Sequence, residues 1–260
     1  MTITGKQLAE LRSCLRRLGA GPSSIPSSAG HAMEAWLMMR LARSARLTGR
    51  WSVTLRRGDA TPLPPGAPFL LPTYQDGIRR ASPSAPCHVL FESAADPTRR
   101  YEMHNGIQWL GRSGATHECD VSVLPETVAG QLRSPGGRPQ GLPIAMFECK
   151  DKPKAANVDE LRQTLARMFD LALVTLPAPG LRCRIYEAVT PRGWGNHRKT
   201  YIDFFASGAF GQVRAGGFST GSISLGVHYR IARMGDIYTN PGSLRLGTVR
   251  FVEALDNAHL

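Results

Sequence analysis

Two acidic residues and a lysine stand at the ends of two apolar segments in the middle of the chain. Asp120 lies in the segment HECDVSV, and Glu148 and Lys150 close the segment PIAMFECK. Because the side chains of a strand alternate between its two faces, Glu148 and Lys150 share one face and the apolar residues share the other. If the two strands pair with their apolar faces aligned, the three polar side chains meet at one end of a sheet.

Such an arrangement predicts a metal site, because two carboxylates held close together repel each other unless a cation lies between them. Mg²⁺ prefers oxygen ligands, keeps several waters and bridges to phosphate groups, so it is the expected ion at Asp120 and Glu148, with Mn²⁺ as an expected substitute. A bound metal polarises a phosphoryl oxygen and lowers the pKa of a coordinated water. Lys150 could then orient or help to deprotonate that water, or stabilise the charge that develops in the transition state. Glu118, on the same face as Asp120, is a further candidate ligand.

Hydrophobic periodicity predicts a helical start and a strand-rich centre. Helices are expected over 6–18 and 30–46, and the proline-rich stretch 61–72 is the candidate boundary that follows them. The centre is expected to contain the strands CHVLFES, RRYEMHNGIQWL, THECDVSVL and LPIAMFECK, then a helix over about 157–175, the strand LRCRIYEAVT, the helix NHRKTYIDFFASGAF and the alternating strand SISLGVHYRIARM.

This order of elements predicts an α/β or α+β sandwich. Three regions are expected within one compact domain. They are an N-terminal helical region, 1–75, that packs on the core, a catalytic core, 76–210, and a strand-rich C-terminal extension, 211–260.

The segments HECDVSV, PIAMFECKD and ANVDELRQTLARMFDLAL together resemble the PD-(D/E)XK nuclease superfamily. The resemblance covers roughly residues 115–190 and implies a restriction-endonuclease-like fold, in which a central mixed β-sheet is flanked by helices. Cys119 stands where the proline that gives the family its name would be. The residues that the resemblance implies for catalysis are Glu34, Asp120, Glu148, Lys150 and Gln163. Of these, Glu34, Asp120 and Glu148 would hold the metal.

The charge of the chain favours a polyanionic partner. The formal net charge is +12 at pH 7, and arginine pairs with phosphates in a bidentate way while counterions are released. A basic surface can also serve solubility alone. Double-stranded DNA is the expected substrate, and a homodimer or a defence-system protein is a candidate partner. The candidate nucleic-acid contacts are Arg138, Trp194, Arg198 and Lys199.

Other sites and other locations have less support in the sequence. The five cysteines are scattered and form no CxxC pair, which indicates a reducing compartment. The absence of a long apolar run and of a signal-peptide pattern predicts a cytoplasmic protein that does not associate with membranes. The GFSTG segment, 217–221, matches the nucleophile elbow of serine hydrolases, but a strand pattern follows it where a helix is required. A zinc site at His117, Cys119 and Cys149 would lie on an otherwise apolar face.

The sequence therefore predicts a Mg²⁺-dependent endonuclease that hydrolyses phosphodiester bonds of DNA, in restriction, antiviral defence or repair. Two alternatives stay open. One is a basic nucleic-acid-binding protein that has the same fold and does not cut, and the other is a nuclease effector that a partner or a messenger activates.

Overall fold

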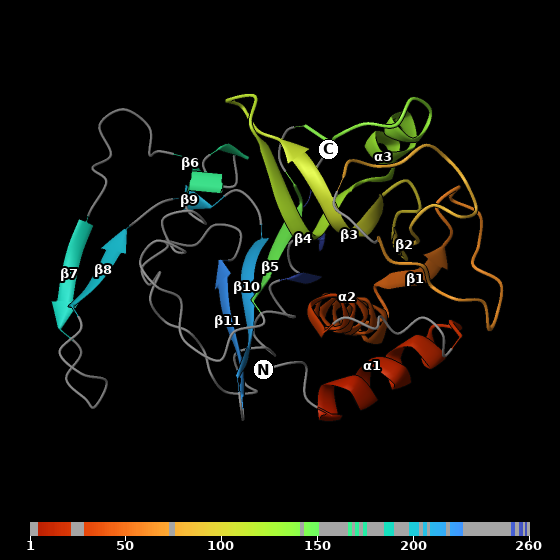
Figure 1. Cartoon of the computed structure of the whole chain (residues 1–260), viewed down its shortest axis with the longest axis horizontal. Helices are drawn as coiled ribbons and strands as arrows, with labels where there is room; N and C mark the ends of the chain where they lie inside the picture. Colours follow the sequence, from red (N-terminus) through yellow and green to blue (C-terminus); the bar gives the residue numbers. More distant parts are fainter. Residues whose placement is uncertain are drawn as a thin grey trace.

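The architecture is that of a computed structural model of the 260-residue chain (Figure 1). The structure describes residues 5–21, 29–72, 76–140, 143–150, 166–167, 170–171, 174–175, 185–189, 198–202, 205–206, 209–216, 219–225, 251–252, 255–256 and 258. Its helices are α1 (Gly5–Arg17), α2 (Ala29–Leu47) and α3 (Glu126–Arg133). Its strands are β1 (Trp51–Arg56), β2 (His88–Ser93), β3 (Arg100–Leu110), β4 (Thr116–Pro125), β5 (Ala145–Lys150), β6 (Val174–Thr175), β7 (Ile185–Val189), β8 (Arg198–Ile202), β9 (Phe205–Ala206), β10 (Ala209–Gly216) and β11 (Ser219–Leu225).

One large sheet organises the molecule, with the strand order β1-β2-β3-β4-β5-β10-β11. Consecutive strands from β1 to β5 pair antiparallel, and so do β10 and β11. β10 runs parallel to β5. The short pairs β6–β9 and β7–β8 form two separate ladders. The mixed α+β class expected from the sequence is therefore confirmed.

Alternation along β1 to β5 builds the core on one face of this sheet. The partners Val53 and Phe91, and likewise Met103 and Val123, belong to one buried cluster, to which α1 and α2 also contribute. In Figure 1, α2 lies between α1 and the sheet, whereas α3 lies near β3 and β4 beyond the other face. The strand residues of the helix-side cluster are Trp51, Val53, Leu55, Val89, Phe91, Tyr101, Met103, Val121, Val123, Ala145 and Phe147.

Helix α2 is buried around its whole circumference over residues 32–39. A helix covered on all sides must be apolar on all sides, and this stretch is AMEAWLMM, in which Glu34 is the one charged residue. Each large apolar side chain removed from water, such as Trp36, contributes about 1.5–3 kcal/mol to stability. Glu34 is 9% exposed, so it needs hydrogen-bond donors inside the protein.

Several elements differ from those that the sequence predicts. β1 lies in a region expected to be helical, and it pairs with β2 at the edge of the sheet. Helix α3 follows β4 directly, in a stretch for which the sequence analysis predicts no element. A helix is expected over 196–210, but this segment instead contains strands β8 and β9 and the start of β10. Its residues KTYIDFF are rich in β-branched and aromatic side chains, which favour strands.

The chain end also differs, since Phe251, Val252, Leu255 and Asp256 are helical and not part of a β extension. Phe251 is fully buried and packs edge-on against Phe91 and Phe147. A search of the described part of the chain found no helix of the length and apolarity that a membrane crossing requires.

Candidate functional site

Strands β4 and β5 bring together the two segments in which the metal ligands are expected. Val121 pairs with Phe147 and Val123 pairs with Ala145, so the apolar faces of the two strands are aligned. Asp120 and Glu148 are the next residues of the two strands beyond the Val121–Phe147 pair. The backbone of Lys150 ends β5, and β10 pairs with β5 on its other side, with Gln212 opposite Glu148 and Arg214 opposite Lys150. The side chains of Glu148 and Lys150 lie outside the described residues.

Asn105 connects the predicted helix glutamate to β4. Its side-chain Nδ2 donates to Glu34 Oε2 and to the backbone carbonyl of Asp120, both at 2.8 Å. Asn105 and Glu34 are both buried, and so is Asp120, at 6% exposed. This buried amide therefore ties helix α2 to the backbone of β4 at the residue expected to bind the metal.

Asn105 contacts the main chain of Asp120 and not its carboxylate. The carboxylates of Glu34 and Asp120 have different surroundings. Alternation puts Asp120 on the face of Ser122, whereas Asn105 pairs with Val121 on the helix side of the sheet. Opposite Asp120, strand β3 has Gly106, whose φ of 58° is a left-handed conformation that favours glycine. Since glycine has no side chain, β3 places none across from Asp120.

The described surroundings of the remaining predicted residues give little support for a role in nucleic-acid binding or catalysis. Arg138 donates to Gln108 Oε1 at 2.9 Å and lies 3.5 Å from Asp76 Oδ1, so it has local partners at the surface. Arg198 and Lys199 begin strand β8 and do not start a helix, which corrects the expectation that they do. Gln163 and Trp194 lie outside the described residues.

Within the described residues, His117 and Cys119 belong to no group of three potential metal ligands; His117 instead has a carboxylate partner. His117 Nε2 lies 2.5 Å from Asp170 Oδ2, and the same carboxylate accepts from the backbone and the hydroxyl of Ser113. These bonds lower the pKa of Asp170 to about 2, with the His117 bond as the largest cause. They fasten the β3–β4 turn to the helical residues near 170.

A second polar cluster, which sequence reasoning missed, lies on the sheet face beneath α3. Glu102 and His104 occupy alternate positions of β3, His88 begins β2, and Arg133 ends α3. All four side chains are buried, and Glu102 is 0% exposed. The register pairs His104 with Ser122, so the cluster shares a sheet face with Asp120 and lies beside it.

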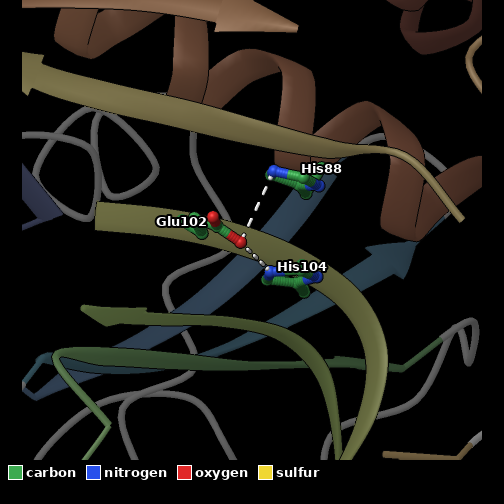
Figure 2. Close-up of side chains that lie close together, drawn as sticks. All are labelled: His88, Glu102 and His104. Atoms are coloured by element: carbon green, nitrogen blue, oxygen red, sulfur yellow. Dashed lines mark hydrogen bonds and ion pairs between the residues drawn. The ribbon is translucent and has the colours of Figure 1, made fainter. Parts of the chain in front are cut away.

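The cluster converges on one oxygen of Glu102, as Figure 2 shows for the two histidines. Nε2 of His104 donates to Glu102 Oε2 at 2.8 Å, and Nε2 of His88 lies 3.4 Å from the same oxygen. Arg133 also donates to this oxygen and lies 3.4 Å from His88 Nε2. The two imidazoles stack with ring centroids 4.9 Å apart.

The electrostatics of the cluster fix its charge at neutral pH. Burial is the main cause that lowers the pKa of His88 to about 3, while Glu102 opposes that shift. Burial raises the pKa of Glu102, but the bonds and charges of His104, His88 and Arg133 outweigh it and leave the pKa at about 2. His88 is therefore neutral and Glu102 ionised at pH 7, and Arg133 is the cation that balances the carboxylate.

A signal for part of this cluster was present in the sequence. Glu102 and His104 form a Glu-x-His pair within RYEMHNGIQWL. Alternate positions of a strand share a face, so this spacing predicts that the two side chains lie together, just as the Glu-x-Lys spacing does in β5. No local pattern adds His88 and Arg133, which are brought in by strand pairing and by α3. Asn105 was missed as well, because a single asparagine in a strand carries no signal of its two partners.

Comparison with models of protein families, with curated proteins and with solved structures found no match to this chain.

Proposed function

We propose that the chain is a Mg²⁺-dependent endonuclease that hydrolyses phosphodiester bonds of DNA, with its site at the paired ends of β4 and β5. The observation that supports this proposal is the register of the two strands, in which Asp120 and Glu148 are the next residues beyond the Val121–Phe147 pair. Lys150 follows two residues later on the same strand. A restriction-endonuclease-like fold is part of the proposal. Its support is the mixed sheet, in which β3, β4 and β5 are antiparallel and β10 is parallel to β5.

The donor set fits Mg²⁺, because aspartate and glutamate supply the oxygen ligands that this ion prefers. Asp120 and Glu148 would hold the ion, whereas Glu34, which bonds Asn105 on the helix side of the sheet, would support β4 from the opposite face. When bound, the metal supplies polarisation of a phosphoryl oxygen and a lowered pKa for a coordinated water.

Lys150 and Asn105 would have different roles in hydrolysis. Lys150 orients the attacking water or stabilises the negative charge that develops on the phosphate. Asn105 acts as a positioning residue, since its bonds to Glu34 and to the Asp120 carbonyl hold β4 in place. Because a displacement of about 1 Å in a catalytic group can cost about 100-fold in rate, this bracing is expected to matter for activity.

The net charge of +12 supports DNA as the substrate. Lys and Arg side chains that neutralise phosphates make binding strongly dependent on salt. We expect Arg138 to contribute to such contacts, since its side chain is 45% exposed at the surface. The proposal extends to a cytoplasmic setting and to a homodimer or a defence-system partner.

The test is the nicking of supercoiled plasmid by the full chain in the presence of Mg²⁺. Wild type is expected to nick, and Asp120→Asn and Lys150→Ala are expected to lose at least about 100-fold in rate. Glu92→Gln is the matched control, because it removes a half-exposed carboxylate from the same sheet. Chelation of the metal should stop the reaction.

Three outcomes separate this proposal from its rivals. Equal nicking by wild type and both variants would reject the assignment of the site. DNA binding without any cleavage, and without a calorimetric Mn²⁺ signal that Asp120→Asn abolishes, would favour a binding protein that does not cut. Cleavage that begins only when a partner or a messenger is added would identify an activated effector.

A further inference from the structure

The cluster beneath α3 contains the groups of a nitrogen-rich metal site. The ligand atoms of His88, Glu102 and His104 all lie within 4.8 Å of one another, and all three residues are buried. Two imidazoles and one carboxylate are the ligands that zinc and related transition metals take in sites with an open position. We propose that His88, Glu102 and His104 bind a divalent transition metal of the zinc type, and that Arg133 takes the place of this ion when the metal is absent.

Arg133 occupies the point where a cation would lie. Its guanidinium contacts both Glu102 Oε2 and His88 Nε2. A guanidinium is a donor only, so the contact with His88 requires that the lone pair of this imidazole be on Nε2. Two ligand atoms therefore already face a positive charge. The third, His104 Nε2, becomes available when the ring proton moves to Nδ1, which changes no net charge.

The surroundings of the cluster contain unsatisfied polar atoms. Within the described part of the chain, Glu102 Oε1 and His88 Nδ1 are buried and have no hydrogen-bond partner. Buried polar atoms without partners are costly, and they often mark a position filled by water or an ion. A cavity of about 30 Å³ adjoins the cluster, lined by His88, His104, Arg133 and others. This volume accommodates one water molecule, which is the fourth ligand that a tetrahedral ion with three protein ligands requires.

The site is distinct from the proposed nuclease centre in residues and in ion preference. Asp120 lies beside the cluster on the same sheet face, but it is not among the three ligands. Imidazole ligands favour zinc-type ions over Mg²⁺, which is bound mainly by oxygen atoms. An excess of Mg²⁺ is therefore not expected to displace the ion.

The test uses Co²⁺ as a probe on the full chain, because Co²⁺ in a tetrahedral site absorbs visible light. Wild type is expected to develop this absorption, and His104→Asn and His88→Asn are each expected to weaken binding by at least about 100-fold. Arg133→Met removes the competing cation and is expected to tighten Co²⁺ binding by more than about tenfold. In this variant Zn²⁺ should also raise the melting temperature, since a ligand that binds only the folded state stabilises it.

The outcomes are decisive even if one variant does not fold. Absence of the cobalt absorption in both wild type and Arg133→Met would overturn the proposal. If Arg133→Met is unfolded, the wild-type titration decides alone. Absorption that persists in the His88→Asn, His104→Asn double variant would also overturn the proposal, as would absorption that Asp120→Asn abolishes. Loss of plasmid nicking in Asp120→Asn with cobalt binding intact would support both sites independently.

Discussion

Removal of the Asn105 side chain is expected to cost the protein much of its stability. The amide is 3% exposed and donates two bonds of 2.8 Å, one to the Glu34 carboxylate and one to the Asp120 carbonyl. A bond to a charged group contributes about 1.5–3 kcal/mol and a neutral one about 0.5–1.5 kcal/mol. Asn105→Ala is therefore expected to lower the free energy of unfolding by about 2–4 kcal/mol.

A double-mutant cycle isolates the bond between Asn105 and Glu34. Asn105→Ala, Glu34→Met and the double variant are unfolded with urea, and the transition is followed by circular dichroism. The coupling energy is expected to be about 1.5–3 kcal/mol, because the bond involves a carboxylate in a dry environment. Gln108→Ala is the control on the same strand, since the side chain of Gln108 accepts a bond from the surface residue Arg138, and a loss below about 1 kcal/mol is expected.

A coupling energy within about 0.5 kcal/mol of zero would refute the reasoning. It would mean that the amide does not join α2 to β4 and that the contact at Asp120 is incidental. If the coupling is found, the same variants are assayed for nicking. Asn105→Ala should then lower the rate more than Gln108→Ala does, because only Asn105 braces the backbone of Asp120.

Four further predictions concern the rest of the molecule. Arg133→Met, in metal-free buffer, is expected to lower the free energy of unfolding by about 3–5 kcal/mol in urea, because it leaves the buried charge of Glu102 uncompensated; a loss below about 1 kcal/mol would contradict this. The free energy of unfolding should fall as the pH drops from about 6.5 through 3, because His88, with its native pKa of about 3, binds fewer protons in the folded state than in the unfolded state. Glu102, with a native pKa of about 2, extends this loss below pH 4.5, and His88→Asn should flatten the upper part of the curve in urea titrations at several pH values. Gly130→Ala in α3 should raise the free energy of unfolding by about 0.5–1 kcal/mol, because a methyl group there meets no atom within 4 Å. Gly77→Ala, in contrast, should lower it, because its methyl group would overlap the carbonyl of Gly137.

Local patterns predicted most of the elements that surround the candidate site. The leucine spacing over 6–18 and the apolar stretch over 30–46 correspond to α1 and α2. Alternation within HECDVSV and PIAMFECK also indicated which faces would be apolar if these two segments paired, and the Val121–Phe147 register shows that their apolar faces are aligned. These predictions depended on residues close in sequence, whose periodicity is visible without the fold.

Other features depend on contacts between distant residues. The segment WSVTLR forms β1 by pairing with β2, whose partner residues lie 32 to 42 positions later in the chain. Its alternation of apolar and polar residues is a strand signal that the sequence prediction missed. The segment after 196 contains enough charged and polar residues to resemble a helix, yet its aromatic and β-branched residues pair as strands.

The chain by itself thus determined which face of each central strand is apolar, and with that the side on which Asp120 and Glu148 would lie once their strands pair. Only the tertiary structure decided the partners of Glu34, which is bound by an asparagine from β3, and the convergence of His88 and Arg133 on Glu102. The reason is that burial leaves a charged group no water to bond, so its partner must come from whichever element packs against it. The partner of a buried charge therefore depends on how the layers pack and cannot be predicted from any one segment.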